Sequence, residues 1–182
     1  MLTPDSPLVT RVVASPNRRA RTLEERIEFL VIHGTWMVGD EGALSRLTDP
    51  VAEVSCHYYI TRTGEIIQLV AERDVAWHAG KSQAVNAAGE LVEGLNGWSI
   101  GIEIANSGSF GGHVPTPELE AHPDWIHVEP YTPAQYAAVK ALVEDIVARN
   151  PGISKERVLG HDEVSPGRKS DPGPHFDWSW WR

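Results

Sequence analysis

The stretch VLGHDEVSPGRKSDPG, residues 158–173, combines an imidazole, an ammonium group and three carboxylates with two Pro-Gly turns. Rigid turns that carry several ionisable groups directly after an apolar run are typical of functional sites built on loops. Lys169 and Asp171 lie two positions apart, so in an extended segment their side chains point the same way. The stretch predicts one side of a catalytic or metal site, and its partners must come from elsewhere in the chain.

The composition is that of one soluble globular domain, with 182 residues, 41% of them hydrophobic and 23% charged. The net charge of −9 argues against nucleic acid as a partner. The single cysteine, Cys56, excludes an internal disulfide and any CxxC motif. The N-terminus has no apolar signal core, and no apolar run approaches the roughly 20 residues of a membrane span. We therefore expect a cytoplasmic protein with no membrane partner.

Short β-forming runs alternate with helical patterns along the chain. Apolar runs predict strands at 28–32 and 99–104, and two runs about Arg62-Thr63-Gly64 predict a hairpin of 57–61 with 65–70. A short helix is expected from Asp40 to Leu47, and a capping box at Thr132 begins a longer helix over 132–149. Together these elements predict a single α/β domain with a mixed central sheet flanked by helices.

Three segments lack a regular pattern. Residues 1–26 are predicted to be an extended polar lead-in, read as a solvated arm, before a domain that spans 27–182. Residues 81–97 are expected to form a surface loop. Residues 106–130 are predicted to form a long loop that acts as a rim or lid.

One histidine stands where α/β folds often place functional groups. His33 ends the predicted strand 28–32 and is followed by Gly34. A catalytic zinc typically takes three protein ligands and leaves the fourth position to water. His33, His161 and Asp171 supply two imidazoles and one carboxylate. With eight histidines in the chain, spacing alone leaves other trios open.

Five segments raise this trio above the alternatives. They are VIHGT at 31–35, VSCHYYI at 54–60, AWHAG at 76–80, SIGIE at 99–103, and the stretch 160–173. In this order they resemble the zinc-dependent N-acetylmuramoyl-L-alanine amidases of the AmpD type, in the amidase_2 and peptidoglycan-recognition superfamily. The resemblance runs from about residue 15 to 178. It implies that family's fold, with a zinc cleft at the strand ends.

The resemblance also implies a reaction and a set of roles. Zn²⁺ would be held by His33, His161 and Asp171, with Glu103 as the catalytic acidic residue and Lys169 as the assisting lysine. The bond cleaved would join the lactyl group of N-acetylmuramic acid to L-alanine of the peptidoglycan stem peptide. Zinc would activate a water, Glu103 would carry its proton to the departing nitrogen, and Lys169 would stabilise the oxyanion.

The substrate side of the site rests on four further candidates. Trp36 and Trp77 flank proposed site residues and are candidates for packing on a sugar face. His78 is expected either to line the cleft or to have a structural role. Arg168 is expected either to bind a carboxylate of the stem peptide or to form a surface ion pair. Cys56 is read as a small buried thiol rather than a zinc ligand.

The biological setting stays open between three readings. The acidic charge and the lack of a wall-binding domain favour recycling of soluble muropeptides. The first alternative is a phage-type endolysin or wall-remodelling amidase that acts on intact peptidoglycan. The second is a peptidoglycan-binding module without catalysis, although such modules lose a zinc ligand and this chain keeps all three.

Overall fold

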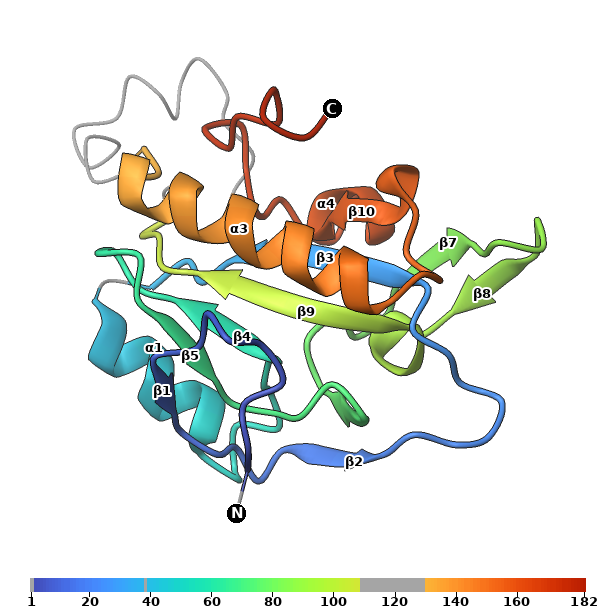
Figure 1. Ribbon diagram of the computed structural model, residues 1–182, viewed down its shortest axis with the longest axis horizontal. Coiled ribbons are helices and arrows are strands. Elements are labelled where there is room, and N and C mark those ends of the chain that lie inside the picture. The colour runs from blue at the N-terminus through green and yellow to red at the C-terminus, as the bar shows by residue number, and fades with distance from the viewer. Residues whose placement is uncertain (1, 38, 109–129) are drawn as a thin grey trace.

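A central sheet of six strands organises the computed structural model, which describes residues 2–37, 39–108 and 130–182 (Figure 1). The strands lie in the order β1-β5-β4-β9-β3-β10. In that order their bounds are Arg11–Val12, Ile66–Gln68, Tyr58–Ile60, Ser99–Ile104, Phe29–Gly34 and Val158–Gly160. The β4–β5 pair is antiparallel and every other neighbouring pair is parallel. The predicted mixed sheet, with its strands and its β4–β5 hairpin, is confirmed.

The two central strands divide their side chains between the faces of the sheet. β3 and β9 run parallel, with Phe29 opposite Ser99 and His33 opposite Glu103. Successive side chains of a strand point to opposite faces. The even-numbered side chains of both strands are apolar and belong to one core, namely Leu30, Ile32, Ile100, Ile102 and Ile104. The odd-numbered positions, which include His33 and Glu103, therefore face the other side.

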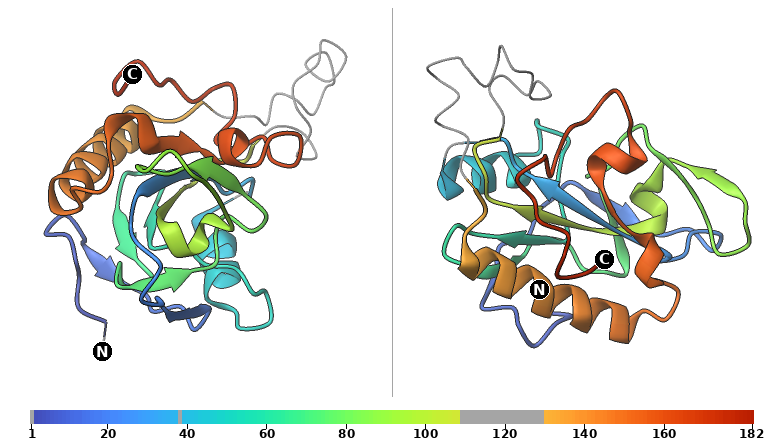
Figure 2. Two further views of the ribbon diagram at one scale, coloured as in Figure 1. Left: turned by 90° about the vertical axis from the view of Figure 1, so that its right-hand side faces the viewer. Right: turned by 90° about the horizontal axis from the view of Figure 1, so that it is seen from above.

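The long helix α3, Pro133–Arg149, covers the even-numbered face (Figure 2). Its first turn is fixed by the predicted capping box. The backbone amide of Gln135 donates to the Thr132 hydroxyl at 3.1 Å, and the backbone amide of Thr132 donates to the Gln135 side-chain oxygen at 2.9 Å. Its buried stripe packs on the sheet through Val139, Leu142, Val143 and Ile146. The helix closes this face with apolar side chains.

The opposite face is covered by shorter elements. Helix α1, Asp40–Thr48, packs Ala43 and Leu47 against the β4–β5 part of the sheet. The short helix α4, His161–Val164, follows β10 and places Val164 in a small cluster with Phe29 and Val31. Because these elements are short, this face leaves room for polar side chains at the strand ends.

Residues 2–26 pair with the rest of the domain, so their interpretation as a separate solvated arm is wrong, although Arg18–Ala20 is exposed. β1 joins the edge of the central sheet, and β2, Arg18–Ala20, pairs antiparallel with β6, Asp74–Ala76. The Arg21 guanidinium donates to the carbonyls of Glu72, Gly97 and Ser99 at 3.1, 2.8 and 2.8 Å. Backbone carbonyls therefore take the place of water around the Arg21 guanidinium.

The expected loop at 81–97 contains regular structure. β7, Gln83–Val85, pairs antiparallel with β8, Leu91–Glu93, and the 3-10 turn η1, Leu95–Trp98, leads into β9. Another 3-10 turn, η4, spans Lys155–Arg157 ahead of β10.

The predicted rim or lid at 106–130 falls mainly on residues 109–129, outside the described part of the chain. Within the described part, no helix has the length and apolar character needed to cross a bilayer.

Candidate active site

The candidate site lies at the carboxyl ends of three neighbouring parallel strands. His33 and Glu103 are the next-to-last residues of β3 and β9, and they are register partners. His161 begins α4 directly after β10, which pairs with β3 on its other side. The carboxyl ends of parallel strands meet at one edge of a sheet, where α/β folds bind their ligands. The sheet order therefore brings together residues that are far apart in the sequence.

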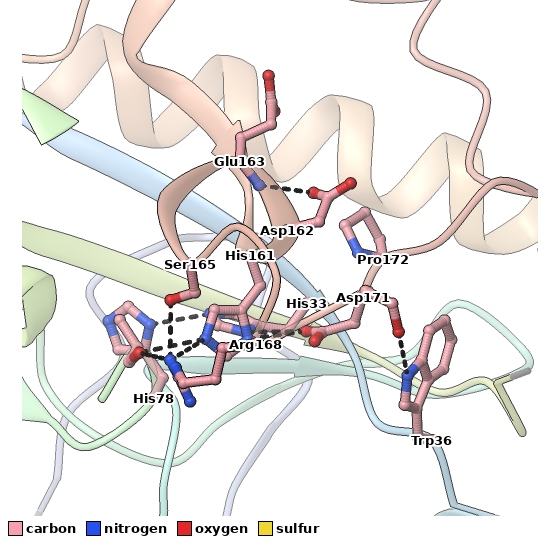
Figure 3. Close-up of polar contacts among 12 residues, drawn as sticks. His33, Trp36, His78, His161, Asp162, Glu163, Ser165, Arg168, Asp171 and Pro172 are labelled. Atoms are coloured by element: carbon pink, nitrogen blue, oxygen red, sulfur yellow. Dashed lines mark hydrogen bonds and ion pairs between the residues drawn. The ribbon is translucent and has the colours of Figure 1, made fainter. Parts of the chain in front are cut away.

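The predicted trio converges at this edge (Figure 3). His33 Nδ1 lies 2.9 Å from His161 Nδ1 and 3.2 Å from Asp171 Oδ2. His161 Nδ1 lies 3.0 Å from the same carboxylate oxygen. All three side chains are buried. The trio forms a group whose ligand atoms could hold a metal ion.

The protonation of His161 is consistent with a metal ligand. Its Nε2 lies 3.2 Å from the Ala79 carbonyl, which can only accept, so in the neutral imidazole Nε2 carries the proton and Nδ1 is bare. Arg168 Nη2 lies 3.4 Å from the same nitrogen, but its two hydrogens have nearer acceptors in the Ala79 and Lys81 carbonyls and the Ser165 hydroxyl, at 2.7–2.8 Å. The contact with the Ala79 carbonyl therefore determines the tautomer.

The three donor atoms fit a cation. Burial and the neighbouring His161 lower the pKa of His33 to about 4, so its imidazole is neutral at pH 7. Burial raises the pKa of Asp171, but the two neighbouring histidines outweigh that effect and hold it below its usual value. A bare imidazole nitrogen and a carboxylate oxygen at such close range repel each other unless a cation lies between them. Two imidazoles and one carboxylate are a donor set that zinc accepts.

Glu103 stands beside this cluster with unused hydrogen-bonding capacity. Its Oε2 is buried and has no hydrogen-bond partner among the described residues. Burial, together with the negative charge of Asp171, raises the pKa of Glu103 to about 8. A buried carboxylate oxygen without a partner is costly, and such strongly shifted groups cluster at functional sites.

A cleft of about 320 Å³ opens onto the cluster. Its walls include Trp36, Trp77, Glu103, Lys169 and Asp171. Both tryptophans are half-buried, whereas Lys169 is exposed. The predicted base, the assisting lysine and the two aromatic side chains therefore share one cleft, and the roles of Trp36 and Trp77 in sugar binding stay predictions.

Gly34, the residue after the first histidine, is required by close packing. A Cβ at this position would lie 2.6 Å from the Tyr131 hydroxyl oxygen. That hydroxyl donates to the Pro172 carbonyl at 2.8 Å, next to Asp171 in the chain. The glycine therefore lets a buried tyrosine reach the loop that carries the carboxylate.

Arg168 has partners that the sequence did not suggest. Its guanidinium donates to the carbonyls of Ala79 and Lys81 and to the Ser165 hydroxyl, so it joins the 79–81 segment to the loop after α4. Among the described residues Arg168 forms no ion pair, which disfavours the alternative of a surface ion pair. A role in binding a substrate carboxylate stays a prediction.

His78 is buried, and its ring nitrogens contact His33 and Ser99. It also lines the cleft, but the contact with His33 favours the structural alternative.

Sequence reasoning missed Ser99 and the Ala79 carbonyl. Gly101 offered a signal, because a Cβ there would lie 2.5 Å from His78 Cγ, and a glycine inside a strand often marks a close approach. Cys56 is a buried free thiol, as predicted.

Comparison with known proteins agrees with this geometry. The Amidase_2 family model, described as N-acetylmuramoyl-L-alanine amidase, matches residues 23–174. The chain is 34% identical over 185 aligned positions to the 1,6-anhydro-N-acetylmuramyl-L-alanine amidase AmpD of Haemophilus influenzae, covering 92% of this chain and 88% of the relative.

Two solved structures have the same fold. The crystal structure of a selenomethionine AmpD derivative superposes with a TM-score of 0.74 at 31% identity, covering 100% of this chain and 98% of that one. The amidase AmiD of Escherichia coli, in complex with anhydro-N-acetylmuramic acid-L-Ala-D-gamma-Glu-L-Lys, superposes with a TM-score of 0.67 at 34% identity, covering 88% of this chain and 58% of that one. The family match and these likenesses over most of the chain show that the protein belongs to the Amidase_2 family and is an N-acetylmuramoyl-L-alanine amidase.

Proposed function

We propose that this amidase is zinc-dependent and that His33, His161 and Asp171 hold the metal. The observation that carries the proposal is the convergence of three donor atoms within 4.8 Å of one another, beside a cleft lined by Glu103 and Lys169. A zinc ion bound there would polarise the scissile carbonyl and activate a water for attack. The bond cleaved joins the lactyl group of N-acetylmuramic acid to L-alanine.

Glu103 moves the proton in this scheme. Its carboxylate accepts a proton from the attacking water and then donates it to the departing L-alanine nitrogen. General acid–base catalysis works best when the pKa of the group lies near the working pH. A pKa near 8, raised by burial and by Asp171, supports this double role.

Lys169 supplies positive charge on the same cleft. It precedes Asp171 by two residues, so one loop delivers both the third ligand and the ammonium group. The ammonium group stabilises the oxyanion that forms when the carbonyl is attacked. Losing one such donor typically lowers the rate by roughly a hundredfold or more.

The proposed substrates are soluble muropeptides with a 1,6-anhydro sugar, cleaved during recycling in the cytoplasm. Two observations support this choice over intact peptidoglycan. The AmpD relative of H. influenzae is named for the 1,6-anhydro sugar, and the chain covers 88% of it. The net charge of −9 also disfavours attachment to polyanionic wall polymers.

A paired digestion tests this function. The zinc-loaded protein is incubated with a soluble anhydro-muropeptide and, separately, with intact sacculi, and the products are identified by mass spectrometry. We expect free stem peptide from the soluble fragment, sensitivity to a chelator, and little release from sacculi. Comparable release from sacculi would instead indicate an enzyme of the intact wall. No release from either substrate would contradict the proposal.

A further inference from the structure

A line of contacts leads from His33 away from the cluster and into the protein interior. His33 Nε2 lies 2.9 Å from His78 Nδ1, and His78 Nε2 lies 3.1 Å from Ser99 Oγ. Ser99 Oγ in turn lies 2.6 Å from the Leu95 carbonyl. The three side chains are buried, with exposed fractions of 1%, 9% and 0% for His33, His78 and Ser99.

The direction of every hydrogen bond follows from the far end of this line. The Leu95 carbonyl can only accept, so the Ser99 hydroxyl donates its single hydrogen there. The hydroxyl oxygen is then left to accept from His78 Nε2–H. The two ring nitrogens of His78 contact an imidazole and a hydroxyl, and burial among such uncharged groups favours its neutral form.

A neutral imidazole carries one N–H, so His78 Nδ1 is bare and accepts a hydrogen bond. The donor is His33 Nε2–H, at 2.9 Å. The proton of His33 is thereby held on Nε2, and its Nδ1 turns a lone pair toward His161 and Asp171.

We propose that Ser99 and His78 are positioning residues that select the metal-binding tautomer of His33. The inference rests on the proposed zinc site. The neighbouring Ala79 performs the same task for the second histidine ligand, because its carbonyl accepts from His161 Nε2–H at 3.2 Å. Residues 78 and 79 thus set the tautomers of both ligands, one through a side chain and the other through the backbone.

The surroundings keep this segment in place. The Asn96 side-chain oxygen accepts from the backbone amides of His78 and Ala79 at 3.0 and 2.7 Å. Gly101 leaves the space that the His78 ring fills. Gly101 and Ser99 lie on β9 two and four residues before Glu103, so all three share the odd-numbered face of that strand.

Removing the Ser99 hydroxyl has a specific consequence. Without an acceptor at Nε2, His78 is free to carry its proton on Nδ1, which faces His33 Nε2. His33 then places its own proton on Nδ1, inside the cluster, and zinc has to displace it. Loss of a group that orients a metal-ligating histidine typically lowers metal affinity about 10–100-fold.

Zinc affinity, measured by competition with a chromophoric chelator, tests the proposal. We expect Ser99→Ala to bind zinc about 10–100-fold more weakly than the natural chain, and Ser99→Thr, which keeps a hydroxyl, to recover most of the loss. Ser15→Ala is the matched control. The buried Ser15 hydroxyl also donates to a carbonyl at 2.6 Å, that of Leu47, and accepts from the Asn17 backbone amide, and neither partner belongs to the metal cluster. Unchanged zinc affinity in Ser99→Ala would overturn the proposal.

Nitrogen NMR on the natural chain, isotope-labelled at its histidines, tests the tautomers of His33 and His78 without any substitution. We expect the protons of both His33 and His78 on Nε2 in the zinc-loaded protein. A proton on His78 Nδ1 would contradict the inference even if Ser99→Ala failed to fold. Unchanged zinc affinity in His33→Ala would rule out the proposed metal site. If His33→Ala weakens zinc binding but Ser99→Ala does not, only the role of Ser99 and His78 is ruled out.

Discussion

His33 and Glu103 are opposite one another on the adjacent parallel strands β3 and β9. Neighbouring strands lie about 4.8 Å apart, and both side chains leave the sheet on the same face. The proposed ligand and the proposed base are therefore spaced by the backbone hydrogen bonds of the central sheet. Sites built on such rigid elements hold their geometry better than sites on loops.

This arrangement predicts that Glu103→Gln keeps metal binding but loses proton transfer. The amide has the shape of the carboxylate but cannot accept the water proton. We expect zinc stoichiometry to be unchanged and kcat to fall by about 10²–10⁴. Metal analysis and steady-state kinetics on an anhydro-muropeptide check this. Near-normal turnover would show that another group moves the proton.

Asp171→Ala is expected to lower zinc occupancy. The substitution removes one of the three converging donor atoms and leaves His33 Nδ1 and His161 Nδ1 2.9 Å apart. Asp162→Asn is a suitable control, because Asp162 follows His161 in the chain but lies outside the cluster. Metal content after dialysis distinguishes the two variants. Full metal content in Asp171→Ala would remove this residue from the ligand set.

Arg168→Ala separates a structural role from substrate binding. Loss of four hydrogen bonds to Ala79, Lys81 and Ser165 should lower the free energy of unfolding by about 1–3 kcal/mol. Arg168→Lys should recover little of the lost stability, because one ammonium group does not reproduce the planar set of donors of the guanidinium. Denaturant unfolding gives the stability. Unchanged stability with a raised KM for substrates that carry free carboxylates would favour the carboxylate-binding role.

Gly34→Ala is expected to destabilise the protein by about 1–3 kcal/mol, because overpacking forces neighbours apart. The added Cβ would meet the Tyr131 hydroxyl oxygen at 2.6 Å. Tyr131→Phe removes that oxygen, at the cost of the hydrogen bond to Pro172. Denaturant unfolding of both single variants and of the double variant gives a double-mutant cycle. The double variant should lose less unfolding free energy than the two single variants lose together. Strict additivity would exclude the contact as the cause.

A charge pair far from the cluster predicts a pH dependence of stability. Glu25 accepts hydrogen bonds from Arg19, which outweigh burial and lower its pKa to about 2. A depressed folded-state pKa contributes stability above the unfolded pKa and loses it as the pH falls through the folded pKa. Glu25→Gln should therefore be less stable than the natural chain at pH 7. The difference should shrink from about pH 4.5 down to pH 2, and a difference that is constant with pH would contradict this origin.

Local patterns in the sequence predicted the elements that bury apolar side chains. The apolar runs of β3 and β9 and the capping box at Thr132 each depend on residues close together in the chain, so the strands and helix α3 follow from them. The hairpin of β7 and β8 escaped prediction because most of its residues are exposed and carry no alternating pattern. The packing of the N-terminal segment escaped because Arg21 donates to backbone carbonyls 51, 76 and 78 positions away, and no local pattern marks such contacts.

The sequence by itself determined which residue types could form a metal site, and the family motifs singled out His33, His161, Asp171 and Glu103. Only the tertiary structure decided how they meet. Sheet order brings His161 to His33 across 128 positions, and it turns His78 and Ser99 into partners of the same ligand. Periodicity records which face of an element is buried. The contacts between faces, and the proton positions that depend on them, exist only once the strands are side by side.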